Sequence, residues 1–328
     1  MAIAQPNTQP QTLVPPKIAL QTVGLSQVHI KGPSDDGLGD GLDYGLDDLI
    51  RGYTVRRPDE RRKIKVKHTS KTNEMIKQFS EVLKLNKDDY YLLKFKEHLE
   101  KTLTDVLTPT EIGIFFQAVL YKTENMQLDD QNDLTSERIG MFTTQLIQLS
   151  YNAGNNDFVL GTENSQRIIS QIGFRLKGNK KQLVKIRIRG DVAAALCINS
   201  SYCEIDVDGD IHNNGYVTGN DSKYCVFIFK GEISDGNYSA EKSIYKTSNE
   251  RALEILILHV LHGAYNQIVF INPDGTEEAV LRHTHDPSTG IFIIQKYYEL
   301  AKQIIGETSF SCPYKMIKVD RLDIKPIV

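Results

Sequence analysis

Two pairs of histidines are the residues of this chain whose type and spacing could support chemistry. His259 and His262 lie three residues apart in an apolar run, so both side chains can face one side of a helix. His283 and His285 are two apart, and in an extended chain both point to one face. Imidazole nitrogen is a common ligand of zinc and related metals. If the two pairs converge, the chain would be a metal-dependent enzyme or an enzyme subunit.

Structural roles explain the same residues equally well. Asp286 precedes Pro287, which is the pattern of a helix N-cap followed by proline. His262 comes just before Gly263, at a helix end whose dipole favours a cation, and His283 suits a strand position facing solvent. The sequence contains no hydrolase signature, phosphate-binding glycine loop or dinucleotide fingerprint. The leading prediction is therefore a non-catalytic structural or interaction protein without a cofactor, with the metal-dependent enzyme as the alternative.

The histidines belong to a predicted helix–hairpin–helix segment. Turn and cap residues punctuate it: Asn249 starts a helix, Gly263 ends it, and Pro273-Asp274-Gly275 has the chemistry of a tight hairpin turn. The predicted elements are a helix over 251–262, strands over 267–272 and 276–281, a helix after Pro287 that includes Ile293 and Ile294, and an edge strand over 316–324. Together they predict an α/β cap over residues 247–328.

A threefold repeat precedes this cap. Each copy is a short alternating strand followed by a glycine, an acid and an aliphatic residue, and the glycines Gly190, Gly209 and Gly231 recur after 19 and then 22 residues. The copies run over 184–192, 203–211 and 225–233. A repeat of this length cannot bury its own apolar face, so neighbouring copies must stack. The pattern predicts a β-solenoid over residues 155–246, in which the three glycines are structural.

Alternation along each repeat predicts which side chains face outward. The first repeat presents lysine and arginine and the second presents glutamate and aspartate, so opposite charges are expected to meet on adjacent strands. The third presents Val226 and Ile228 instead. An apolar patch on an outer face predicts contact with a partner. Cys203 and Cys225 occupy equivalent positions and are predicted to stack as reduced, buried fillers.

This rung pattern resembles the β-helix of the GXGXG type, found at the C-terminal end of glutamate synthase large subunits and in a formylmethanofuran dehydrogenase subunit. Residues 184–233 carry the resemblance, through the rung period and the Gly-Asp-aliphatic step. Where that family has its turn glycines, this chain has Ala193, Cys197 and Asn199. The rungs are also similar to those of uncharacterised archaeal repeat proteins. The resemblance implies a positioning element and no reaction of its own.

Helices are predicted before the repeat, over residues 72–154. Their clearest start is Thr108-Pro109-Thr110-Glu111, a capping box with proline at the first helical position. The predicted fold class is therefore α+β, with an N-terminal helical bundle, a short single-stranded β-solenoid and a helix–hairpin–helix cap. The predicted domains are 1–71, 72–154, 155–246 and 247–328.

Residues 1–71 are predicted to be a disordered tail and charged linker. An acidic, glycine-rich run over 35–49 is followed by basic residues, which include Arg56, Arg57, Arg61, Arg62 and Lys63. Clustered cations can contact nucleic acid phosphates or a protein partner. Nucleic-acid binding through residues 51–71 is accordingly a second alternative function.

The composition of the chain limits the classes of protein to which it can belong. A formal net charge of −3 gives no general attraction to polyanions, and 40% hydrophobic residues suffice for a core. No apolar run approaches the roughly 20 residues that span a bilayer, and the first residues lack a secretory signal pattern. With only 4 cysteines, the thiols are predicted to be reduced. We expect a cytoplasmic protein with protein partners and no membrane contact; the oligomeric state stays open.

Overall fold

The computed structural model describes residues 69–85, 92–124, 134–163, 165–212, 218–234, 238, 240–260, 266–283, 290–307 and 315–324. The described residues belong to one compact unit, Tyr44–Val328. None of the helices in these ranges is long and apolar enough to cross a membrane.

Among the described residues, four helices precede the sheet. They are α2 (Ser70–Val82), α3 (Leu92–Thr102), α4 (Pro109–Thr123) and α5 (Leu134–Asn152). The predicted capping box of α4 is confirmed, because the Thr108 hydroxyl accepts from the Glu111 N–H and the Glu111 carboxylate accepts from the Thr108 N–H at 2.9 Å. Phe115 of α4 stacks on Phe142 of α5 at 5.2 Å between ring centroids, with Phe79 of α2 edge-on to both.

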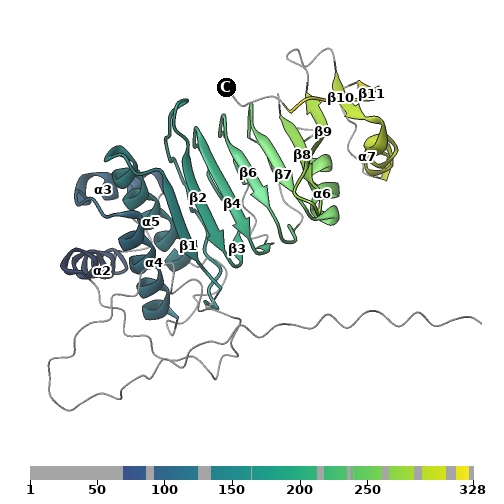
Figure 1. The fold of residues 1–328 in the computed structure, drawn as a ribbon. Helices are drawn as coiled ribbons and strands as arrows, with labels where there is room; N and C mark the ends of the chain where they lie inside the picture. The colour runs from purple at the N-terminus through teal and green to yellow at the C-terminus, as the bar shows by residue number, and fades with distance from the viewer. Residues whose placement is uncertain are drawn as a thin grey trace, which may run out of the picture. The chain divides into compact units, whose positions relative to one another are not determined.

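One large sheet dominates the remainder. Its nine strands follow the order β1-β2-β4-β6-β7-β8-β9-β10-β11 and are parallel except at the two pairings of β9. Figure 1 shows β2, β4, β6 and β7 side by side, with α4 and α5 next to β1. The strands are β1 (Asp157–Gly161), β2 (Val184–Arg189), β4 (Cys203–Asp208), β6 (Val226–Phe229), β7 (Ile244–Thr247), β8 (Gln267–Ile271), β9 (Glu277–His283), β10 (Ile291–Ile294) and β11 (Met316–Val319).

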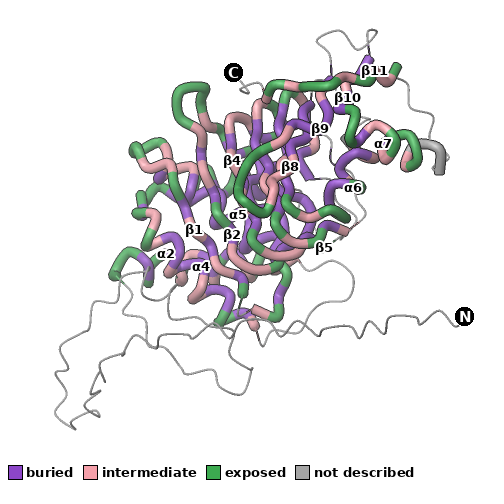
Figure 2. The backbone as a smooth tube through the Cα atoms, turned by 45° about the vertical axis from the view of Figure 1, so that its right-hand side comes forward, coloured by how far each residue is buried: buried purple, intermediate pink, exposed green. Residues whose placement is uncertain are grey.

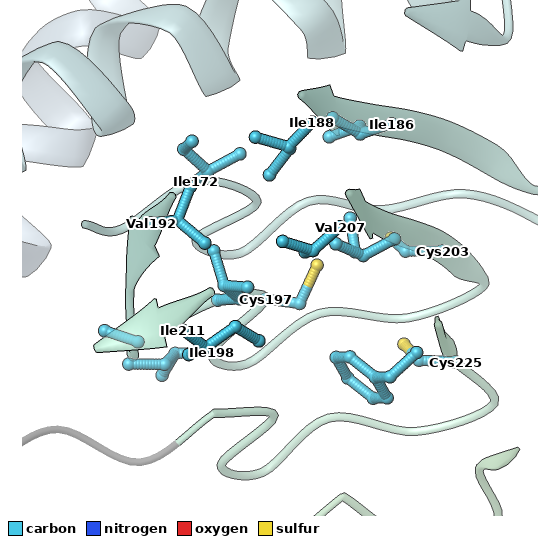
Figure 3. Close-up of a cluster of buried hydrophobic side chains, with 14 of the residues drawn as sticks. Ile172, Ile186, Ile188, Val192, Cys197, Ile198, Cys203, Val207, Ile211 and Cys225 are labelled. Carbon is cyan, nitrogen blue, oxygen red and sulfur yellow. The ribbon is translucent and has the colours of Figure 1, made fainter. Parts of the chain in front are cut away.

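The three predicted repeats pair in the register that their sequence pattern indicates. Val184 lies opposite Cys203, and Ile205 opposite Phe227. After Gly190 and Gly209 the chain enters a small second sheet, β3 (Val192–Ala193) paired with β5 (Ile211–His212), and after Gly231 a single bridge joins Ile233 to Ile211. Figure 3 shows side chains of the large sheet, such as Ile188 and Val207, pointing toward Val192 and Ile211 across the core.

The predicted fold class is wrong. A separate helical bundle followed by a short single-stranded solenoid and a cap would give three cores, whereas one hydrophobic core runs from Met75 of α2 to Ala301 of α7. The sheet is open and does not stop at the repeats: it begins one strand earlier, at β1, and continues through the hairpin to β11. Figure 2 shows buried positions in the helices and in the strands alike. A repeat in the sequence identifies strands that pair with each other, but not how far the sheet extends beyond them.

The C-terminal segment differs in part from its prediction. Helix α6 (Glu250–Val260) and the antiparallel hairpin of β8 and β9 form as expected. Ile293 and Ile294, however, lie in strand β10, and helix α7 (Gln295–Glu307) begins only after them. Isoleucine is branched at Cβ and favours strands, and here it extends the sheet beside β9.

Close backbone contact explains the glycines that end the repeat strands. A Cβ atom on Gly209 would lie 2.3 Å from the carbonyl carbon of Gly190, and one on Gly231 would lie 2.3 Å from the carbonyl oxygen of Gly209. Any side chain at these positions would force adjacent rungs apart.

We therefore predict that Gly209→Ala destabilises the protein by about 2–3 kcal/mol, because the added methyl group overlaps neighbouring backbone. Chemical denaturation monitored by circular dichroism measures the change. The exposed neighbour Asp208 provides the control, and Asp208→Ala should shift stability by less than about 0.5 kcal/mol. Equal stability of the two variants would contradict the contact that we describe.

Candidate interaction surface

The outward face of the sheet is a network of ion pairs between strands. Lys185 contacts Glu204 at 3.6 Å, and the other pairs on or beside this face are Arg187–Asp157 at 2.6 Å, Lys230–Asp206 at 2.9 Å and Lys246–Glu277 at 2.6 Å. These pairs connect β1 to β2, β2 to β4, β4 to the end of β6, and β7 to β9. These four cations thus have partners within the chain.

Val226 and Ile228, the residues predicted to meet a partner, lie among these pairs. Val226 is only 8% exposed and Ile228 is partly exposed. Their row neighbours Ile244 and Val269 are buried as well, at 5% and 0%. The side chain of Lys246 is 18% exposed with its ammonium group held by Glu277, so its aliphatic stem lies against the sheet. Ile228 is therefore the accessible part of this apolar strip.

The acid that follows each repeat glycine has a structural use. The Asp210 N–H donates to the Asp191 carboxylate, and the Glu232 N–H donates to the Asp210 carboxylate, both at 2.8 Å. Each carboxylate thereby accepts a backbone hydrogen bond from the next rung. The spacing of the Gly-acid pairs was visible in the sequence, but this ladder of side chain and backbone was not predicted.

The turns between the two sheets carry unusual backbone. Cys197 and Asn199 adopt positive φ angles of 51° and 56°. Buried hydroxyl groups support these turns: the Ser222 hydroxyl donates to the Cys197 carbonyl and accepts from the Ser200 N–H at 2.9 Å. Sequence reasoning missed this serine ladder, whose only signal is a serine at the same place in successive repeats.

The predicted cysteines are buried free thiols. Cys203 begins strand β4 and Cys225 directly precedes the adjacent strand β6, with Cys197 nearby from the turn (Figure 3). Burial raises the pKa of Cys203 well above its ordinary value, and hydrogen bonding to Cys203 together with burial does the same to the pKa of Cys225. Both are therefore protonated at neutral pH and act as core side chains rather than nucleophiles.

The structure describes two of the four candidate histidines, His259 and His283. His283 is 6% exposed and its N–H donates to the Asn266 carbonyl at 3.0 Å, so it does not face solvent as expected. The His259 ring lies 5.9 Å from the ring of Tyr238. His262 and His285 lie outside the described residues, as do Arg56, Arg57, Arg61, Arg62 and Lys63. Among described residues, no group of three or more His, Cys, Asp or Glu is arranged to hold a metal ion.

A stack of aromatic rings marks the corner where the repeat strands begin. The rings of Tyr202 and Tyr224 are parallel to within 7°, with centroids 4.9 Å apart. The ammonium group of Lys242 lies 5.4 Å from the Tyr224 ring centroid. Tyr202, Tyr224 and Lys242 each have a positive φ angle. Tyr202 directly precedes strand β4, and Tyr224 and Lys242 each stand two residues before the start of a strand, β6 and β7. The sequence signal is a tyrosine directly before Cys203 and before Cys225.

Lys96 of α3 is a buried cation near the same end of the sheet. It is 2% exposed and donates to the Gln145 side-chain oxygen at 2.5 Å. Burial lowers the pKa of Lys96 to about 8; Glu100 opposes this effect, and repulsion from Arg175 and Lys177 adds to it. Folding thus places a lysine where its charge is poorly solvated.

Comparison with known proteins adds no relative. No protein-family model matches the chain, and neither does any curated protein or solved structure. The resemblance to GXGXG-type β-helices therefore stays a prediction based on the rung pattern.

The Lys96 environment predicts a pH dependence of stability. Because the pKa falls from 10.5 to about 8 on folding, the unfolded chain binds more protons between these values, and stability rises with pH across this window. Relative to Lys96→Met, the wild type should gain up to about 3 kcal/mol from pH 8 to 10.5. Denaturant titrations at several pH values measure this difference, and Lys101→Met, an exposed lysine of the same helix, is the control. If the free energy of unfolding changes with pH in the same way for the wild type and for Lys96→Met, the prediction is wrong.

Proposed function

We propose that this chain is a non-catalytic scaffold or interaction protein that presents the outward face of its sheet to a protein partner. The supporting observation is a mostly parallel sheet with helix α6 packed against its inward face. Helix α6 contacts β7 and β8, and its buried side chains join the core that contains the inward residues Tyr245 and Ile268. In the described part of the chain, no helix lies over the opposite face in the view of Figure 1. Parallel sheets in α/β proteins usually have both faces covered.

The chemistry of this face favours a protein over a polyanion. Lys185, Arg187, Lys230 and Lys246 are already neutralised by carboxylates, so little net attraction for phosphate remains there. Ile228 is a partly exposed aliphatic side chain surrounded by ion-paired residues. An apolar centre with a polar rim is the usual anatomy of a protein interface. We propose a partner that covers Ile228 with apolar side chains.

A cytoplasmic location is part of the proposal. It is supported by three free thiols, Cys197, Cys203 and Cys225, which lie close together in the core without forming a disulfide.

Site-specific photo-crosslinking in the native cell tests the proposal. A photoreactive amino acid at position 228 should give a defined adduct, whereas the same group at Ile168, an isoleucine 41% exposed on another surface, should not. The partner identified in this way is then purified. Its affinity should fall at least about tenfold for Ile228→Thr and stay unchanged for Ile168→Thr. An adduct that forms equally at both positions, or an affinity insensitive to Ile228→Thr, would contradict it.

A further inference from the structure

One row of side chains on the outward face runs through all nine strands of the large sheet. The strand pairings place its members opposite one another in succession: Asp157, Lys185, Glu204, Val226, Ile244, Gln267, Arg282, Phe292 and Ile317. The row is charged over β1, β2 and β4, and it is apolar at β6 and β7 and again at β10 and β11. Apolar side chains of the outward face therefore extend well beyond Ile228, as far as β11.

Several outward aliphatic side chains are buried although they do not belong to the main core. Four of them, on β6 to β9, are at most 8% exposed and lie outside the hydrophobic core cluster: Val226, Ile244, Val269 and Ala279. Part of their cover comes from the stem of Lys246, whose ammonium group is held by an ion pair. The remaining cover must come from other parts of the chain on this side of the sheet.

The segment that follows β11, residues 320–324, does not continue the sheet. Strand β11 ends directly before it, although the alternation of polar and apolar residues continues, so the edge strand is shorter than its sequence pattern predicts. The apolar residues Leu322 and Ile324 are half-buried, whereas the polar residues Arg321 and Asp323 are exposed. The segment therefore turns its apolar side toward the protein without pairing as a strand.

A hydrogen bond joins this segment to the outward row. The Arg282 guanidinium of β9 donates to the Asp323 carbonyl at 3.2 Å. Because β10 lies between β9 and β11, residues 320–323 must cross β10 to reach Arg282. Phe292 is the residue of the row between Arg282 and Ile317, so the crossing takes the segment past Phe292.

We infer that residues 320–324 form a displaceable strap, which covers the outward side of β10 and competes there with the protein partner. The inference rests on the proposed function and names a regulation of the same face. Residues 320–324 form no strand, so their displacement breaks no ladder of backbone hydrogen bonds among the described residues. Ile228 and Phe292 lie four strands apart, about 19 Å, and a standard interface of about 800 Å² per partner is wide enough to include both.

A fluorescent reporter under the strap tests whether the strap covers β10. The chain has no tryptophan, so Phe292→Trp introduces a unique reporter. The double variant Leu322→Ser/Ile324→Ser weakens the apolar contacts of the strap, so acrylamide should quench the reporter more strongly and its emission should shift to the red. The matched control, Arg321→Ser/Asp323→Ser, changes two exposed residues of the same segment and should alter neither readout. Equal quenching in all three backgrounds would overturn the inference.

Truncation after Val319 is the second variant, because it removes the strap and keeps the residues of β11. It should increase the quenching of the reporter in the same way, with an unchanged circular dichroism spectrum. The partner captured by crosslinking at position 228 then tests the competition. If the strap leaves the face in about one tenth of the molecules, truncation should tighten partner binding about tenfold.

The two proposals fail in different ways. Partner affinity that is unchanged by truncation, with an intact crosslink at position 228, would remove this inference alone. Absence of a crosslink at position 228 in both the wild type and the truncated chain would remove the protein-partner proposal, and the quenching of the reporter would still decide whether the strap covers β10. A crosslink that forms only in the truncated chain would support both.

Discussion

Backbone contact between successive rungs is the constraint on which the rest of this structure depends. At Gly190, Gly209 and Gly231 the chain of one rung touches the chain of the next, and no side chain fits between them. This contact fixes the register of β2, β4 and β6. The register in turn determines which carboxylate meets which N–H group, which thiols lie together, and which charges face each other on the outer surface. A shift by one residue would move every aliphatic side chain of these strands out of the core.

The sequence predicted the stacking of the three repeats well, because their pattern is local and periodic. The repeat pattern gave the stacking of β2, β4 and β6, and the capping box gave the start of α4. The full extent of the sheet could not be predicted in this way. Strand β1 belongs to no repeat, and Ile293 and Ile294 satisfy an apolar helix face as readily as a buried strand until a neighbouring strand is available. Whether such a segment forms a strand or a helix depends on its pairing with strands distant in sequence, and that pairing cannot be inferred from a single sequence.

The candidate surfaces, too, could be predicted only in part from the sequence. Val226 was correctly placed on the outer side by alternation, yet alternation says nothing about the long stems of neighbouring lysines, which cover much of the strip. The aromatic corner escaped prediction because its geometry depends on three residues with positive φ angles, a conformation that tyrosine and lysine rarely adopt.

The carboxylate ladder also gives the repeat a direction. The Asp191 carboxylate accepts from the second rung, and the Asp210 carboxylate accepts from the third. The middle rung therefore offers an acceptor on one side and a backbone donor on the other. A rung with both groups can be inserted or removed as a unit without leaving either group unmatched. Lengthening by whole rungs is thus chemically simple for this architecture, and the two ends of the stack, at β1 and β8, are what limits it.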